Sequence, residues 1–97
     1  MVISAWNYPI YTSIPQVAAA IAAGNSVILK PTEMAPYSSE VLGRLFYKYL
    51  DKSNSFIYAG YYRCIQGKIN VAKKLTSLPF DMICFTGSTE TGKLVAI

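Results

Sequence analysis

The sequence has no histidine and little charge. Only 14% of its 97 residues are Asp, Glu, Lys or Arg. Without imidazole groups, this stretch cannot by itself build a serine–histidine catalytic pair or a histidine-containing zinc site. Cysteine is also scarce, because only Cys64 and Cys84 are present, in apolar surroundings and without metal-ligand spacing. We therefore expect no metal site, and we expect buried, unreactive thiols in a reducing intracellular compartment, the cytoplasm.

Charge is missing altogether from the start of the chain, because no charged residue precedes Lys30. A long uncharged stretch can form a bilayer helix, which needs about 20 continuous apolar residues. Here Pro9, Pro15 and the Gly24-Asn25 pair divide the stretch into shorter pieces. No basic segment precedes the apolar residues, so a secretory signal is not expected either. We expect buried elements of a soluble core and no membrane span in this segment.

The charge that is present is a net +4, spread along the chain with no dense basic run. Isolated Lys and Arg residues of this kind are typical of solvated helix faces, so nucleic-acid binding is not expected. The hydrophobic fraction of 53% is high for a small free-standing domain. Because a chain of this length buries only about two-thirds of its extended surface, we expect one small domain that packs against another surface.

Apolar periodicity alternates between strand and helix along the chain. Strands are predicted at residues 2–6, 26–30, 64–66 and 80–85, and helices at 11–23, from 36 onward, at 70–78 and after Gly87. This alternation predicts an α/β fold with a doubly wound, Rossmann-like parallel sheet. Two helices have predicted buried faces, which comprise Val41, Leu42, Leu45, Phe46, Tyr49 and Leu50 in one and Val71, Ala72, Leu75 and Leu78 in the other.

A glycine-rich turn follows the last predicted strand. The spacing from Gly87 to Lys93 fits a phosphate-binding loop, although Leu94 stands where that motif needs a hydroxyl to hold magnesium. The same stretch fits a dinucleotide-binding turn that lacks its middle glycine, with Gly92 allowing the helix to pack closely on its strand. A third interpretation is an ordinary strand-to-helix turn with Ser88 or Thr89 as the N-cap. The first two interpretations place a phosphate at a helix N-terminus, where backbone N–H groups are unpaired.

Polar or glycine-bearing residues follow every predicted strand. They are Trp6-Asn7, Lys30-Pro31-Thr32-Glu33, Gln66-Gly67 and Thr86-Gly87-Ser88. In a doubly wound sheet, ligands bind at the carboxyl ends of the strands. All four groups are therefore expected at one edge of the sheet, which predicts a ligand site there.

Three ordered motifs resemble the aldehyde dehydrogenase superfamily, and its class 3, fatty-aldehyde-type branch most of all. They are Ala5-Trp6-Asn7-Tyr8-Pro9, the stretch AAGNSVILKPTE at 22–33, and Phe85-Thr86-Gly87-Ser88-Thr89. The resemblance covers nearly the whole chain, and it implies that residues 1–97 are part of an NAD(P)-binding domain whose Rossmann-like sheet is incomplete in this chain. It implies the cofactor-binding part of an enzyme that oxidises a small-molecule aldehyde to a carboxylic acid with NAD, NADP being possible, and that forms a homo-oligomer when complete.

The resemblance also implies roles for individual residues. Asn7 matches the catalytic residue whose side-chain amide binds the oxyanion of the reaction intermediates, although its spacing alone favours a turn asparagine beside Pro9. The implied cofactor contacts are Ala5, Trp6, Lys30, Pro31, Glu33, Gly67, Gly87 and Ser88. Lys30 and Glu33 match the residues that hold the adenosine ribose, but without the family they would be interpreted as a solvated loop pair. Trp6 is expected to pack rather than to react.

The chain also departs from the family pattern. Residues 53–63 form a longer connection than is usual there, and the family's nucleophilic cysteine and general-base glutamate lie in segments outside this sequence. We therefore expect this chain alone to be inactive. The alternative is a non-catalytic protein, a pseudoenzyme or structural subunit, that uses the same fold to bind a nucleotide or a protein partner. Leu94 disfavours a phosphate-loop hydrolase.

Overall fold

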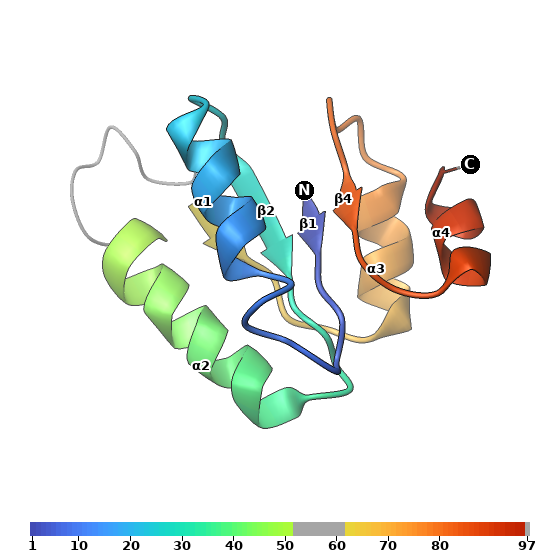
Figure 1. Cartoon of the computed structure of the whole chain (residues 1–97), viewed down its shortest axis with the longest axis horizontal. Helices are drawn as coiled ribbons and strands as arrows, with labels where there is room; N and C mark the ends of the chain where they lie inside the picture. Colours follow the sequence, from blue (N-terminus) through green and yellow to red (C-terminus); the bar gives the residue numbers. More distant parts are fainter. Residues whose placement is uncertain (52–61, 97) are drawn as a thin grey trace.

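Strands and helices alternate along the chain in the computed structural model, which describes residues 1–51 and 62–96 (Figure 1). The elements are β1 (Val2–Ile3), α1 (Ile14–Ala22), β2 (Val27–Lys30), α2 (Pro36–Phe46), a π-helical turn η1 (Tyr47–Asp51), β3 (Tyr62–Cys64), α3 (Ile69–Thr76), β4 (Cys84–Phe85) and α4 (Thr89–Ala96). None of the helices in these two ranges is long and apolar enough to cross a membrane.

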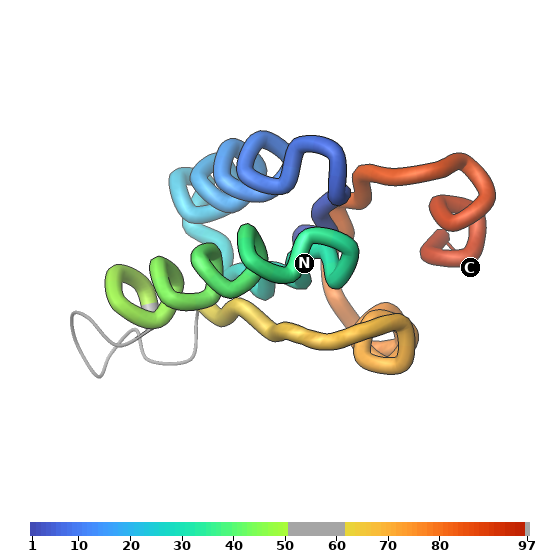
Figure 2. The backbone as a smooth tube through the Cα atoms, turned by 90° about the horizontal axis from the view of Figure 1, so that it is seen from below, coloured from blue at the N-terminus to red at the C-terminus, as the bar shows by residue number. Residues whose placement is uncertain are grey.

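The four strands form one parallel sheet in the order β3-β2-β1-β4. The chain begins at β1, moves outward through β2 to β3, and then crosses back to place β4 on the other side of β1. Helices α1 and α2 cover one face of the sheet, whereas α3 lies behind β4 on the opposite face (Figure 1, Figure 2). The predicted α/β class and the parallel, doubly wound sheet are confirmed.

The hydrophobic core lies between the sheet and the two helices α1 and α2. Its buried members are Val2, Val17, Val27, Leu29, Leu42 and Phe46. Val27 and Leu29 alternate along β2, so both point to the same face of the sheet. Burial of each such side chain contributes about 1.5–3 kcal/mol. This core fixes the position of β2, and with it the residues at the carboxyl end of that strand.

The bounds of several elements differ from the predicted ones. The first helix begins at Ile14 rather than near residue 11, because the Thr12 and Ser13 hydroxyls donate to the carbonyl oxygens of Tyr8 (2.8 Å) and Pro9 (2.6 Å) and hold a turn there. The last strand comprises only Cys84–Phe85, and the third begins at Tyr62, earlier than predicted. The unusual length predicted for 53–63 falls mainly outside the described residues.

The predicted buried face of α2 is partly wrong. Leu42 and Phe46 are buried, but Val41, Leu45 and Tyr49 are 48%, 43% and 56% exposed. The helix turns about 100° per residue, so the face that meets the sheet carries Ser39, Leu42 and Phe46. Val41 and Leu45 each precede one of these residues and therefore lie to one side of this face. In α3, Leu75 is buried as predicted, whereas Leu78 lies beyond the end of the helix and is exposed.

Candidate functional site at the carboxyl edge of the sheet

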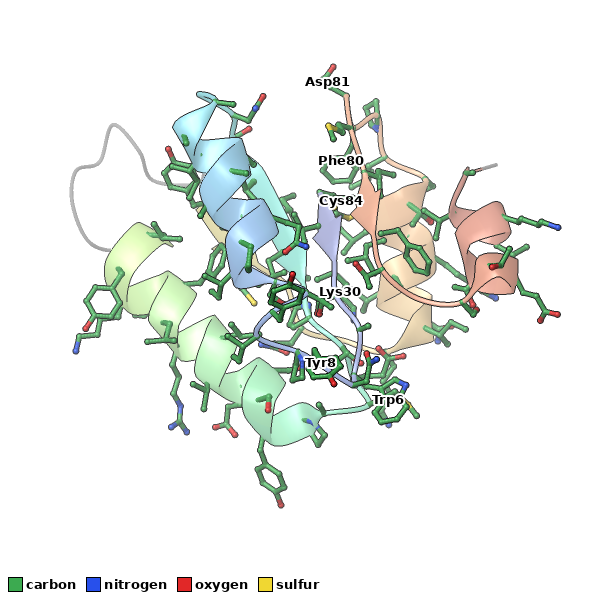
Figure 3. The ribbon with its side chains drawn as sticks, in the orientation of Figure 1. Trp6, Tyr8, Lys30, Phe80, Asp81 and Cys84 are labelled. Carbon is green, nitrogen blue, oxygen red and sulfur yellow. The ribbon has the colours of Figure 1, made fainter. Side chains whose placement is uncertain are left out.

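The residues that follow the four strands lie along one edge, because all the strand pairs are parallel. In Figure 1 every arrow points to this edge. Figure 3 shows Trp6 and Tyr8 there, and Phe80 and Asp81 at the opposite edge. After β1 the chain leaves toward β2, whereas β4 lies on the other side of β1. The neighbouring ends of β1 and β4 therefore form the topological switch point where doubly wound sheets bind ligands.

Lys30 and Glu33 form an ion pair at the end of β2. The Lys30 side chain is only 2% exposed, and its Nζ donates to the carbonyl oxygen of Pro31 at 2.7 Å and to Glu33 Oε2 at 3.4 Å. The Glu33 side chain is 39% exposed. Without the family, Lys30 and Glu33 would be interpreted as a solvated loop pair. For Lys30 this interpretation is wrong, because its ammonium group is buried and is stabilised by these two acceptors. Part of the Glu33 carboxylate is therefore accessible at this edge, and the buried Lys30 ammonium group compensates its charge.

Buried hydroxyl groups hold the loop that carries Glu33. The Ser39 Oγ donates to the Thr32 carbonyl oxygen, and the Met34 N–H donates to Thr32 Oγ1 at 3.1 Å. Ser39 and Thr32 are 2% and 6% exposed. The sequence pattern did not predict this role of Ser39. Because both bonds flank Glu33, they restrict where its carboxylate can point.

The turn between β4 and α4 is capped by Ser88. Its Oγ accepts a hydrogen bond from the Thr91 N–H at 3.2 Å and donates to Thr91 Oγ1 at 2.9 Å. Glu90 lies exposed in the first turn of α4, where a carboxylate favours the positive end of the helix dipole. The side chain of Ser88 is exposed, so the same hydroxyl remains accessible to a ligand.

Gly87 and Gly92 both lie against the ring of Phe85. A Cβ at Gly87 would be 2.5 Å from Phe85 Cζ, and a Cβ at Gly92 would be 3.4 Å from Phe85 Cε1. Gly87 has no positive φ. A glycine suits this position because a larger residue would overlap the Phe85 ring, and not because the backbone is left-handed.

The loop after β1 carries exposed polar and aromatic side chains. Trp6 is 64% exposed, so the prediction that it packs is wrong within the described structure. Asn7 is exposed, and its side chain makes no hydrogen bond to residues 1–51 or 62–96. Thr12 holds this loop instead, because its Oγ1 accepts from the Ala5 N–H at 3.0 Å. The Asn7 carboxamide is thus available to a ligand.

Two clefts open at this edge. The first has a volume of about 480 Å³ and is lined by Asn7, Tyr8, Pro9, Ile10, Tyr11, Ile14 and Pro15. The second has a volume of about 680 Å³ and is lined by Thr32, Glu33, Pro36, Ser39, Glu40, Gly43, Arg44, Tyr47, Cys64, Gln66, Gly67 and Lys68. The loop of the ion pair and the loop that follows β3 thus line the same cleft.

Gly67, in the loop after β3, is required by the backbone. Its φ is +150°, and a Cβ there would lie 2.5 Å from Val71 Cγ2. Any other residue would be strained at this position. The resemblance implies a cofactor contact at Gly67, and the close approach within the described residues is to Val71.

Cys64, at the end of β3, is half-buried. Burial raises the pKa of its thiol to about 11, and the charge of Lys30 opposes this shift. The protonated form of this thiol therefore predominates at neutral pH, as expected for an unreactive cysteine. Cys84 is also half-buried, and both thiols are free.

A family model for the aldehyde dehydrogenase family matches residues 1–97. The chain belongs to this family. It is 42% identical over 95 residues to aldehyde dehydrogenase family 3 member H1 of Arabidopsis thaliana, covering 98% of this chain and 18% of that protein. It is 40% identical to a mouse (Mus musculus) protein named dimeric NADP-preferring aldehyde dehydrogenase, covering 98% of this chain and 19% of that protein.

A solved structure gives the same result. The substrate-bound state of Staphylococcus aureus AldH matches with a TM-score of 0.81 and 35% identity, covering 98% of this chain and 19% of that one. The predicted aldehyde dehydrogenase family and its class 3 branch are therefore confirmed. The chain spans about a fifth of the length of the relatives it matches.

Proposed function

We propose that this chain is the cofactor-binding part of an NAD(P)-dependent aldehyde dehydrogenase that oxidises a small-molecule aldehyde to a carboxylic acid. The observation that carries the proposal is the Lys30–Glu33 pair, held at the carboxyl end of β2 two strands away from the capped N-terminus of α4. A dinucleotide needs both a partner for its ribose hydroxyls and a donor-rich site for its pyrophosphate. The residues present fit both requirements.

The ion pair determines how the adenosine ribose would be held. The exposed part of the Glu33 carboxylate accepts hydrogen bonds from both ribose hydroxyls, which favours NAD. The buried Lys30 ammonium reduces the repulsion that this carboxylate exerts on a 2′-phosphate, so NADP remains a possible cofactor. Pro31 supports the pair, because its carbonyl oxygen fixes the Lys30 ammonium group.

The turns after β1 and β4 would hold the rest of the cofactor. The Ser88 hydroxyl and the free N–H groups at the start of α4 bind the pyrophosphate, and Gly87 keeps the turn close to β4. Ala5 and Trp6 contribute contacts from the neighbouring strand end, and Gly67 contributes them from the loop after β3. When bound, NAD(P) supplies the hydride acceptor of the oxidation.

Asn7 would act on the aldehyde. Its exposed carboxamide donates an N–H to the oxyanion that develops when a nucleophile adds to the carbonyl carbon. A single donor of this kind contributes on the order of 3 kcal/mol to the transition state.

We also infer that the chain does not oxidise aldehydes by itself. The nucleophile in such a reaction is a thiolate, whereas burial raises the pKa of Cys64 to about 11 and Cys84 packs against the core. The nucleophile would come from another part of a longer, homo-oligomeric, intracellular protein.

The ion pair provides the test. In the full-length protein, Lys30→Met should weaken NAD binding by roughly tenfold, because it removes a charge that orients Glu33. The variant should stay folded with a melting temperature lowered by a few degrees, because the methionine fills the buried volume but the buried Pro31 carbonyl oxygen loses its donor. Lys48→Met is a matched control on the exposed part of η1.

The NAD dissociation constant, measured by calorimetry, separates the outcomes. Unchanged affinity in the Lys30→Met protein would refute the ribose assignment. NAD binding by a full-length protein that does not oxidise any aldehyde would favour the non-catalytic nucleotide-binding alternative instead.

A further inference from the structure

Gln66, just after β3, is tied to helix α2. Its Nε2 donates to the carbonyl oxygen of Ser39 at 2.7 Å, across 27 positions of sequence, and lies 3.7 Å from Cys64 Sγ. Both hydrogens of the amide nitrogen therefore have an acceptor. Ser39 is also the residue whose hydroxyl holds the loop of Glu33. Gln66 thus belongs to the same hydrogen-bonded framework as the ion pair.

The orientation of the Gln66 amide follows from its neighbours. A Cβ at Gly43 would lie 2.6 Å from Gln66 Nε2 and 3.8 Å from Cδ, so the nitrogen side of the amide faces α2 at a place where only glycine leaves room. The Ser39 carbonyl oxygen can only accept, so the nitrogen must be the atom that faces it. The planar amide consequently directs Oε1 away from the helix. Gln66 and Glu33 line the same cleft of about 680 Å³.

The strand order determines which part of a dinucleotide would reach this cleft. From one side of the sheet to the other, the edge presents Ser88 after β4, Glu33 after β2 and Gln66 after β3, with β1 between β4 and β2. Neighbouring strands lie about 4.8 Å apart. A dinucleotide with its pyrophosphate at Ser88 and its adenosine ribose at Glu33 therefore continues toward β3, which brings the base to Gln66.

We propose that Gln66 is a specificity-determining residue for the base of the cofactor. Its Oε1 accepts a hydrogen bond from the 6-amino group of adenine, and the bond from Nε2 to Ser39 holds the acceptor in place. A base with a keto oxygen at this position presents an acceptor to an acceptor, so it binds less tightly. This inference rests on the proposed function, because it presumes that a dinucleotide lies along the edge.

The experiment compares two dinucleotides in the full-length protein by calorimetry. In nicotinamide hypoxanthine dinucleotide a keto oxygen replaces the 6-amino group of NAD, and the neighbouring ring nitrogen N1 carries a proton. The wild-type protein should prefer NAD by roughly five- to tenfold, the worth of one hydrogen bond of this kind. In Gln66→Leu the ratio of the two dissociation constants should approach one.

Two further variants separate the effect of the Gln66 amide from a general effect on folding. Gly43→Ala leaves the glutamine intact but displaces its amide from α2, so it should also lower the ratio. Gln16→Leu makes the same substitution on α1, away from the cleft, and should leave the ratio unchanged. The ratio is informative because a purely structural role of Gln66 would weaken both dinucleotides by the same factor.

The possible outcomes separate failure of this inference from failure of the proposed function. If NAD binds but the wild-type protein shows no preference, or if Gln66→Leu keeps the wild-type ratio, the inference is overturned and the proposed function stands. If neither dinucleotide binds to the wild-type protein, the proposed function is overturned as well.

Discussion

Two buried serines differ in whether their hydroxyl has a partner. Ser4 is 6% exposed, and its Oγ has no hydrogen-bond partner among the described residues, whereas Ser13 is fully buried and donates to the Pro9 carbonyl oxygen at 2.6 Å. A buried hydroxyl without a partner costs about 1–3 kcal/mol in desolvation, while a satisfied one contributes about 1 kcal/mol. We expect Ser4→Ala to leave the free energy of unfolding unchanged or raise it by about 1 kcal/mol, and Ser13→Ala to lower it by a similar amount. Urea unfolding of both variants measures the difference, and the reverse order would contradict this account.

Cys64 should make the free energy of unfolding depend on pH in the alkaline range. Burial raises the pKa of its thiol from 9.0 to about 11 in the folded chain. Between these values the unfolded chain releases the proton and the folded chain retains it, so the contribution of this thiol is complete below pH 9 and is lost as the pH rises through 11. Urea midpoints measured at several values across this range should therefore fall more steeply for the wild-type protein than for Cys64→Ala. Parallel curves would show that the thiol does not titrate differently in the folded state.

At the scale of single elements, the sequence predicted turns and helix ends better than strand lengths. The Gly24-Asn25 break and the start of α2 at Pro36 follow from local backbone chemistry, and the structure has both. Strand lengths depend on partners that are distant in sequence. Val2 pairs with Cys84 and Ile3 with Phe85, so β1 and β4 share the same short length although longer strands were predicted.

The same reasoning explains which parts of the candidate site could be predicted. Residues at strand ends were found because parallel strands all end at one edge. The burial of Lys30 and the bond between Gln66 and Ser39 could not be found, because they depend on how α2 packs against the sheet.

Two glycines with positive φ provide a test at the level of turns. Gly24 has a φ of +85° and nothing within 4 Å of a built Cβ, whereas Gly67 has a φ of +150° and a Cβ there would lie 2.5 Å from Val71. Gly24→Ala should cost about 1 kcal/mol of stability from backbone strain alone. Gly67→Ala should cost about 3 kcal/mol, since overlap with α3 is added to the strain. Equal losses in urea unfolding would show that the contact with Val71 is relieved without cost.

At the scale of the whole molecule, the carboxyl edge carries far more exposed aromatic surface than a free-standing domain needs. Trp6, Tyr8, Tyr11 and Tyr37 are 64%, 66%, 72% and 84% exposed. Large apolar patches of this kind mark surfaces that other protein covers. The chain also spans only 18% of the length of its Arabidopsis relative. Much of the exposed apolar surface therefore lies at the edge that carries the candidate site, and further exposed apolar side chains lie on α2, η1 and α4.

The exposed aromatic surface at this edge predicts how the chain behaves when it is produced alone. We expect it to self-associate at micromolar concentration, because each aromatic ring buries about 150–250 Å² on contact with another copy. The double variant Trp6→Ser, Tyr8→Ser should shift sedimentation toward the monomer. Met82→Ser is the matched control, because Met82 is 75% exposed and follows Asp81, which lies at the opposite edge of the sheet. A wild-type chain that sediments as a monomer and melts cooperatively would contradict the prediction. Equal effects of the two sets of substitutions would show that association has no preference for the edge that carries the site.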